Sequence, residues 1–157
     1  MEVSHHFTIF ADYFQFLVMD EASRDDFSVI WNDSSLERML AVGQSSLCPG
    51  TLRNVNVEVE VAILKEPPSV NVEEYDHAVE GSFAVTTGSL VVMSCTGYLP
   101  DAPRITVPIG TYQALYLMSG IETITNEWES AQDRYSLYLW RGEPREAKLL
   151  KHWKSAA

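Results

Sequence analysis

Hydrophobic and polar side chains alternate along residues 55–63, where every second position is Val or Ile. Successive side chains of a β-strand point to opposite faces, so this segment has one apolar and one polar face. The same alternation recurs in residues 79–85 and 135–139. It is typical of antiparallel sheets with one packed and one solvated face. We expect Glu58 and Glu60 to face water, and the apolar set to be buried: Val57, Val59, Val61, Phe83, Val85, Leu137 and Leu139.

Other short segments are rich in aromatic and β-branched residues, which favour strands. These segments are residues 7–10, 13–19, 27–31, 90–95, 104–107 and 111–118. Gly and Pro residues separate them as turn formers do. About eight short strands with closely spaced turn signals predict an all-β protein, an antiparallel β-sandwich with one or two short helices. Because no strand–helix–strand alternation occurs, we expect no parallel sheet and a mostly antiparallel sandwich.

One helix is expected to begin near residue 33. Asp33 or Ser34 can cap its first turn, Glu37 stands at capping-box spacing from Ser34, and Gly43 is a plausible stop. Residues 39–42 form either the end of this helix or another strand. Residues 119–133 form either a loop or a short helix at 127–132.

The chain has 157 residues and a formal charge of −11, with a net charge of −13 in residues 1–142 and +2 in residues 143–157. We expect one sandwich domain over residues 1–142 and a basic C-terminal tail over 143–157. The tail either packs on the same domain, for instance as a short helix, or reaches a partner. A helix there would place Leu149, Leu150 and Trp153 on one face.

The acidic charge argues against binding to nucleic acid or to anionic membranes, which needs clustered Lys and Arg. It permits docking on a basic protein. The two cysteines, Cys48 and Cys95, do not make a disulfide framework. No basic, apolar leader and no apolar run long enough to span a membrane are visible, so we expect a cytoplasmic protein.

Acid–base chemistry has one candidate, the group Asp76, His77 and Glu80, because a carboxylate beside an imidazole can transfer protons. These residues are an alternative ligand or enzyme site, although Asp76 and His77 would diverge on a strand. The histidines have no metal-ligand spacing, so no metal and no cofactor are predicted. No nucleophile motif or phosphate loop occurs, and we assign no catalytic residue.

An acidic segment around Trp128 is the candidate surface for binding a partner. It contains Glu122, Glu127, Trp128, Glu129 and Asp133. Carboxylates around an aromatic anchor can imitate the phosphates that a basic nuclease holds. A third possibility is a carbohydrate-binding module, which would expose several rings. Its candidate rings are Tyr98, Tyr112, Tyr116, Trp128, Tyr138 and Trp140.

Residues 75–142 resemble a block of uncharacterised bacterial proteins. In that block an Asp-His strand (here Tyr75-Asp76-His77-Ala78-Val79-Glu80) precedes a Cys-Thr-x-Tyr turn (Cys95-Thr96-Gly97-Tyr98) and an Arg-Ile hairpin (Arg104-Ile105). No activity is known for these proteins. The resemblance therefore implies no site.

The order of elements also resembles the competence protein J family, the inhibitor of the DNA-entry nuclease. The resemblance is carried by His6-Phe7-Thr8-Ile9-Phe10, by Trp31, and by Pro108-Ile109-Gly110-Thr111-Tyr112. It implies a protein-binding role, as an inhibitor or immunity-type protein against a basic nuclease or toxin.

Overall fold

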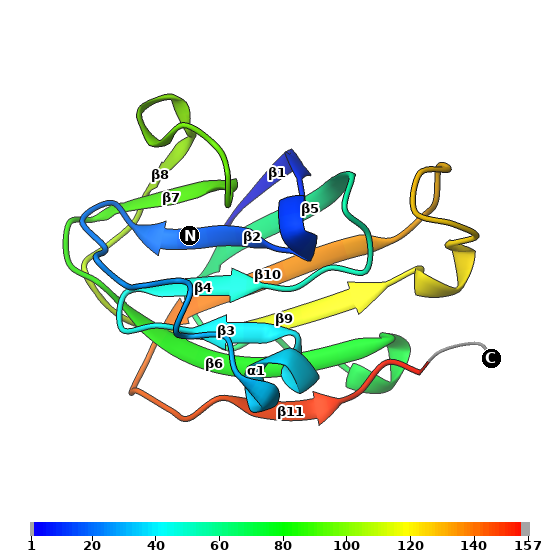
Figure 1. Ribbon diagram of the computed structural model, residues 1–157. Helices are drawn as coiled ribbons and strands as arrows, with labels where there is room; N and C mark the ends of the chain where they lie inside the picture. Colours follow the sequence, from blue (N-terminus) through cyan, green and yellow to red (C-terminus); the bar gives the residue numbers. More distant parts are fainter. Residues whose placement is uncertain (1, 155–157) are drawn as a thin grey trace.

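The protein consists of two β-sheets packed face to face (Figure 1). Its structure is a computed structural model, which describes residues 2–154. The larger sheet contains, in spatial order, β1 (Val3–Phe10), β5 (Asn56–Leu64), β10 (Arg134–Arg141), β9 (Gly110–Ser119), β6 (His77–Val85) and β11 (Lys148–Lys151). The smaller contains β3 (Leu40–Val42), β4 (Ser46–Pro49), β2 (Phe16–Asp20), β7 (Ser89–Ser94) and β8 (Arg104–Thr106). The expected all-β class with few short helices is confirmed.

The helical elements are short and lie in the connections. They are α1 (Asp33–Arg38) and four 3-10 turns, η1 (Asp12–Phe14), η2 (Val72–Glu74), η3 (Leu99–Asp101) and η4 (Ile121–Thr123). None of the helices among residues 2–154 has the length and apolar character needed to cross a membrane.

The core lies between the sheets, and the alternating strands supply it as expected. Val59 is 2% exposed, and Val61 and Leu137 are completely buried. The other apolar residues expected inside are buried too: Val57, Phe83, Val85 and Leu139. On the opposite face of β5, Glu58 is exposed and Glu60 half-buried. Burying each Val or Leu contributes about 1.5–3 kcal/mol, so the alternation accounts for much of the sandwich's stability.

The sandwich is mostly antiparallel, as expected, and the described strands contain one parallel pair, in the interior of the larger sheet. There β10 pairs in parallel with β5, with Tyr135 opposite Val59 and Leu137 opposite Val61. Turn signals report only pairs of strands that follow each other along the chain. Between β5 and β10 the chain makes β6 to β9, so no turn and no crossover helix marks this pair.

The expected helix exists but is shorter and capped one residue earlier. Asn32 is the N-cap, and its side chain and that of Ser35 form a reciprocal capping box. The helix ends at Met39 in a left-handed conformation, not at Gly43, and the strand alternative for the following residues is realised as β3. Residues 27–31 form turns and a bend, so the strand expected there is wrong.

The C-terminal tail packs on the sandwich as a strand, so the expected helix there is wrong. In the tail, β11 pairs antiparallel with β6, and Lys148 lies opposite Glu80. Arg145 Nη1 lies 2.5 Å from Glu80 Oε2, and Lys151 Nζ lies 3.8 Å from Glu73 Oε2. An otherwise open edge of β6 offered backbone partners, and these outweighed the helical spacing of the apolar residues.

Candidate functional site

The connection between β9 and β10, residues 120–133, projects from one end of the sandwich and is hereafter called the Trp128 loop (Figure 1). Trp128 is 77% exposed, the largest exposed fraction among the large hydrophobic residues described. Glu122 and Glu129 are exposed and Glu127 is half-buried. Apart from η4, the loop is irregular, so the alternative of a helix at 127–132 is wrong.

A buried ion pair fixes the base of the Trp128 loop. Asp133 accepts two hydrogen bonds from Arg53, at 3.1 Å from Nε and 2.6 Å from Nη2, and a third from Tyr135 Oη at 2.8 Å. Arg53 also donates from Nη1 to the carbonyl of Glu129 at 2.8 Å. Both side chains of the pair are almost fully buried. A paired and hydrogen-bonded buried charge loses much stability if one partner is removed, so this contact holds the loop in one place.

Short side chains shape the rest of the loop. Asn126 Oδ1 accepts the amides of Trp128 (3.1 Å) and Glu129 (2.8 Å), a local turn that Asn favours. Thr123 Oγ1 accepts the amide of Gln132 at 2.8 Å and joins the two arms. The polypeptide around Trp128 is therefore fixed while its ring faces solvent.

The acidic residues expected to meet a partner divide into two roles. Glu122, Glu127 and Glu129 lie on the loop beside Trp128. Asp133 is 1% exposed and its carboxylate is occupied by Arg53, so its charge is directed inward. The loop that exposes Trp128 therefore carries two exposed carboxylates, Glu122 and Glu129, and the half-buried Glu127.

The alternative group of Asp76, His77 and Glu80 is not brought together. Asp76 Oδ2 accepts the amide of Ile121 at 3.1 Å, at the start of the Trp128 loop. His77 and Glu80 lie on opposite faces of β6, and Glu80 is paired with Arg145. Each of the three side chains is used in a separate structural contact.

His77 is completely buried and links two distant segments. Its Nδ1 accepts the amide of Trp153 at 3.1 Å, so Nε2 carries the proton and donates to the carbonyl of Arg38 at 2.6 Å. Burial lowers the pKa of His77, and the ring of His152, 5.5 Å away, lowers it further. The neutral imidazole thus joins the end of α1 to the C-terminal segment.

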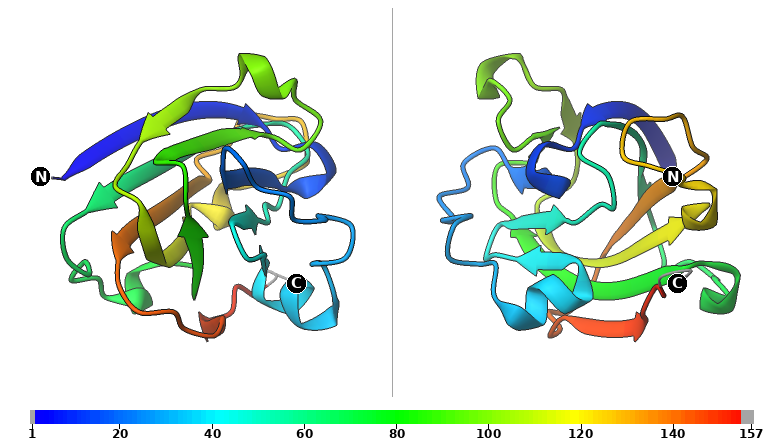
Figure 2. Two further views of the ribbon diagram at one scale, coloured as in Figure 1. Left: turned by 90° about the vertical axis from the view of Figure 1, so that its left-hand side faces the viewer. Right: turned by 45° about the vertical axis from the view of Figure 1, so that its right-hand side comes forward.

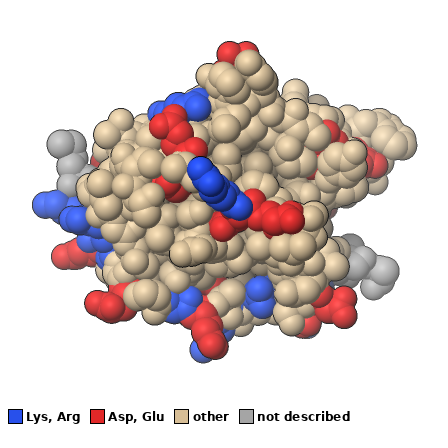
Figure 3. All heavy atoms as spheres, turned by 60° about the vertical axis from the view of Figure 1, so that its left-hand side comes forward, with Lys and Arg blue, Asp and Glu red and all other residues tan. Residues whose placement is uncertain are grey.

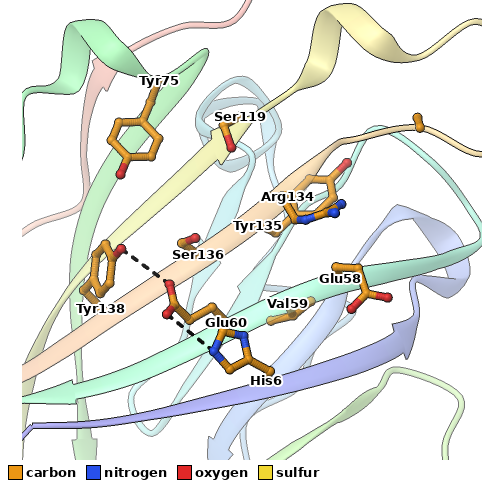
Figure 4. A pocket seen from close by; sticks show the side chains of 11 residues that line it. His6, Glu58, Val59, Glu60, Tyr75, Ser119, Arg134, Tyr135, Ser136 and Tyr138 are labelled. Atoms are coloured by element: carbon orange, nitrogen blue, oxygen red, sulfur yellow. Dashed lines mark hydrogen bonds and ion pairs between the residues drawn. The ribbon is translucent and has the colours of Figure 1, made fainter.

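A polar groove of about 630 Å³ crosses the outer face of the larger sheet (Figure 4). Glu60 lies at its centre, 3.4 Å from Tyr138 Oη and 3.9 Å from His6 Nε2, and it accepts a hydrogen bond from Ser4 at 2.7 Å. Burial and then the charge of Glu60 raise the pKa of Tyr138 to about 12. Glu58 likewise accepts the hydroxyl of Thr8 at 3.0 Å. These carboxylates are already hydrogen-bonded within the sheet, so the groove is a satisfied polar surface.

The candidate rings for a carbohydrate surface are scattered. Tyr112, Tyr116 and Trp140 are buried, and of the six candidate rings only Tyr98 and Trp128 are largely exposed. Tyr98 precedes η3 and Trp128 lies in the β9–β10 connection, so the two do not form a row. Within residues 2–154, no group of three or more His, Cys, Asp or Glu side chains converges as metal ligands do.

Charge is arranged differently on the opposite side of the molecule. On the face shown in Figure 3, Lys and Arg side chains are interspersed with Asp and Glu. Away from the Trp128 loop, Arg104 donates from Nε to Glu21 at 2.7 Å. The Trp128 loop, by contrast, carries three acids beside an exposed indole, which makes it the stronger candidate for a partner surface.

Sequence reasoning identified Trp128 and the acids but missed Arg53, the residue that positions them. Arg53 and Asp133 are separated by 80 residues, and no local pattern links them. Two further exposed aromatic residues, Tyr13 and Phe14, stand at the start of the strand expected over residues 13–19 but lie in η1. The aromatic and branched composition of residues 13–19 predicted a strand there, because such residues normally favour strands.

Comparison with known proteins shows the fold. No protein-family model matches the chain, and no curated protein matches it by sequence. Among solved structures, ComJ from Bacillus subtilis, described as an inhibitor of the DNA-degrading activity of NucA, superposes with a TM-score of 0.65 at 19% identity, over 89% of this chain and 96% of ComJ. The product of crocagin biosynthetic gene J superposes with a TM-score of 0.64 at 15% identity, over 91% of this chain and 99% of that one. The chain has a ComJ-like fold.

Proposed function

We propose that this chain is a protein-binding inhibitor of a basic nuclease or toxin and that it docks through the Trp128 loop. The observation that supports this most is the 77% exposed indole of Trp128 in a loop fixed by a buried ion pair. A rigid aromatic anchor binds with little loss of conformational entropy, and tryptophan is enriched among residues that dominate binding energy.

The carboxylates of the loop supply the complementary charge. Glu122, Glu127 and Glu129 lie on the same loop as the indole, and the whole chain carries a formal charge of −11. A nuclease that holds nucleic acid presents Lys and Arg to phosphates, and carboxylates can occupy the same positions. Such charges mainly accelerate the encounter between partners, while buried anchors slow dissociation.

The likeness of fold supports the same class of function. ComJ is described as the inhibitor of a DNA-degrading enzyme, and its fold covers most of this chain. A ComJ-like fold makes an inhibitor a natural first hypothesis, and the exposed loop provides a surface with the required chemistry.

Replacing Glu122, Glu127 and Glu129 together by Gln should slow association with the partner about tenfold at low salt and leave dissociation nearly unchanged. The partner is captured from the native host at about 0.05 M salt and released at about 0.5 M, where the screening length shortens to a few ångströms. Surface plasmon resonance then gives both rates. A matched control replaces three exposed acids elsewhere, Glu2→Gln, Glu66→Gln and Asp101→Asn, and should change association less.

Trp128→Ala should instead accelerate dissociation roughly 30-fold, the effect of about 2 kcal/mol expected for an anchor residue. Inhibition is measured as DNA degradation by the captured protein, and by purified NucA, with increasing amounts of this chain. If no nuclease is inhibited, and if neither salt nor the three Gln substitutions changes the association rate, the proposed function is wrong.

A further inference from the structure

The turn η1 holds two bulky aromatic residues in a backbone conformation they rarely adopt. Tyr13 has φ 58° and ψ 28°, and Phe14 has φ 60°. Within the described chain, the only other non-glycine residue with positive φ is Met39. The rings of Tyr13 and Phe14 are 70% and 45% exposed, so burial of the rings does not compensate for the backbone strain. Strain that persists without such compensation is a common mark of a functional segment.

Contacts from several elements impose this conformation. The amide of Phe14 donates to Ala11 (3.0 Å), and the carbonyl of Phe14 accepts the amide of Thr51 (2.9 Å). Asp12 Oδ2 accepts the hydroxyl of Thr96 at 2.7 Å. The turn is therefore built into the fold and presents its two rings in a fixed direction.

The rings of η1 border an apolar pocket of about 330 Å³ beside α1, hereafter called the α1 pocket. Its principal lining residues are Tyr13, Phe14, Trp31, Leu36 and Met39. Trp31 Nε1 donates to Gln15 Oε1 at 2.9 Å, which satisfies the indole and leaves its ring for the pocket. Leu36 is 62% exposed. The volume is at the lower end of pockets that receive ligand groups, enough for one or two apolar side chains.

Acidic residues stand beside the pocket. Asp33 and Glu37 are exposed on α1, and Asp33 precedes Leu36 by three positions, which places it on the same helix face. An apolar side chain that enters the pocket beside Leu36 would thus approach the carboxylate of Asp33. Charge complementarity selects an occupant in which this apolar side chain is flanked by Lys or Arg.

The turn η1, which borders the α1 pocket, and the Trp128 loop lie at the same end of the sandwich (Figure 2, right). The connection between β4 and β5 passes between them. Its Thr51 bonds Phe14 on one side, and its Arg53 holds Asp133 on the other. One partner surface can therefore face both.

We infer that the α1 pocket is a second anchor site, which receives an apolar side chain, flanked by Lys or Arg, from the same basic protein that meets the Trp128 loop. This inference rests on the proposed function for the identity of the partner. The pocket can be tested without the partner, because a short peptide can carry the apolar side chain and the neighbouring Lys or Arg that it would bind.

The test selects short random peptides, displayed on phage, on the intact protein at about 0.05 M salt, where surface charges are little screened. Enriched peptides should carry an apolar residue next to Lys or Arg. They should bind at least about tenfold more weakly to Leu36→Ser and to the double variant Tyr13→Gly, Phe14→Gly. Glycine accepts positive φ, so the double variant keeps the turn while removing both rings. Ile109→Ser is the matched control, since Ile109 is also 62% exposed and lies outside the pocket.

Two results would overturn the inference: no enrichment of such peptides, or equal binding by the parent, Leu36→Ser and the double glycine variant. The captured partner separates this inference from the proposed function. If the partner dissociates faster from Trp128→Ala but at the parent rate from both pocket variants, the pocket inference fails and the proposed function stands. If the peptides require the pocket and no nuclease is inhibited, the pocket stands and the nuclease assignment fails.

Discussion

The Trp128 loop and the turn η1 both expose aromatic side chains at one end of the sandwich, but they are held by different means. The loop depends on a buried Arg53–Asp133 ion pair and on side-chain hydrogen bonds, with no strained non-glycine residue. The turn depends on backbone hydrogen bonds that enforce left-handed Tyr13 and Phe14. A left-handed conformation costs a non-glycine residue about 1–2 kcal/mol. Side-chain interactions therefore fix the conformation of the Trp128 loop, whereas backbone hydrogen bonds fix that of η1.

This difference predicts which substitutions each region tolerates. Loss of one charged partner should loosen the loop, whereas loss of an aromatic side chain should relax the turn.

Arg53→Met should destabilise the protein by about 3–5 kcal/mol, because it leaves Asp133 buried without a positive partner. The free energy of unfolding is measured by urea denaturation. Arg145→Met is the matched control. It removes the half-exposed pair with Glu80 and should cost less than about 1 kcal/mol.

The double variant Arg53→Met, Asp133→Leu should recover much of the loss, since no unpaired charge remains. Equal costs for Arg53→Met and Arg145→Met would show that the buried pair does not hold the Trp128 loop.

Acid should destabilise the α1 side of the molecule first, through His77. The pKa of His77 is lowered in the folded protein. Above about pH 6.5 the imidazole is therefore neutral in both the folded and the unfolded protein, and its contribution to the free energy of unfolding is fully present. Below this pH, His77 binds a proton in the unfolded chain but stays neutral in the folded protein. The free energy of unfolding therefore decreases as the pH falls, until the pH reaches the pKa of His77 in the folded protein. Protonation of Nδ1 removes the acceptor for the Trp153 amide.

Melting temperature against pH tests this prediction. His77→Gln should flatten the decrease below pH 6.5, whereas His6→Gln, on the outer face, should keep it. A separate decrease at lower pH is expected from Asp20 and Asp25, whose pKa values hydrogen bonds hold below the usual 3.8 despite the opposing effect of burial. A parent protein that melts equally at pH 7 and pH 5 would contradict the role of His77.

Tyr13→Gly should change stability little or raise it by up to about 1 kcal/mol. It relieves about 1–2 kcal/mol of left-handed strain and adds about 0.5–1 kcal/mol of unfolded-state entropy. Trp128→Gly relieves no such strain and should destabilise by about 0.5–1 kcal/mol. Thermal and urea unfolding distinguish the two signs. The same sign at both positions would remove the distinction between the regions.

Much of the sandwich could be predicted from alternation alone. The strands β5, β6 and β10 show it because one face of each packs against the core. The parallel pairing of β5 with β10 left no local mark, and β11 was hidden because pairing with the edge of β6 outweighed its helical spacing.

For the candidate site, the residues that stand together in the chain could be predicted from the sequence. The features that depend on contacts between distant residues could not. The exposed Trp128 and its acids stand together in the chain. The inward orientation of Asp133 depends on Arg53, far away in sequence. The exposure of Tyr13 and Phe14 depends on positive φ values, which aromatic residues give no reason to expect.

The position of β10 has a consequence for how the protein is made. This strand lies in the interior of the larger sheet between β5 and β9, yet it begins at Arg134, so it is synthesised after all nine preceding strands. Until then β5 has one open edge, and an unpaired strand edge can pair with another chain. Because the pairing of β5 with β10 closes a long stretch of polypeptide, we expect slow folding that cannot finish before β10 is made, with nascent chains that need protection from aggregation.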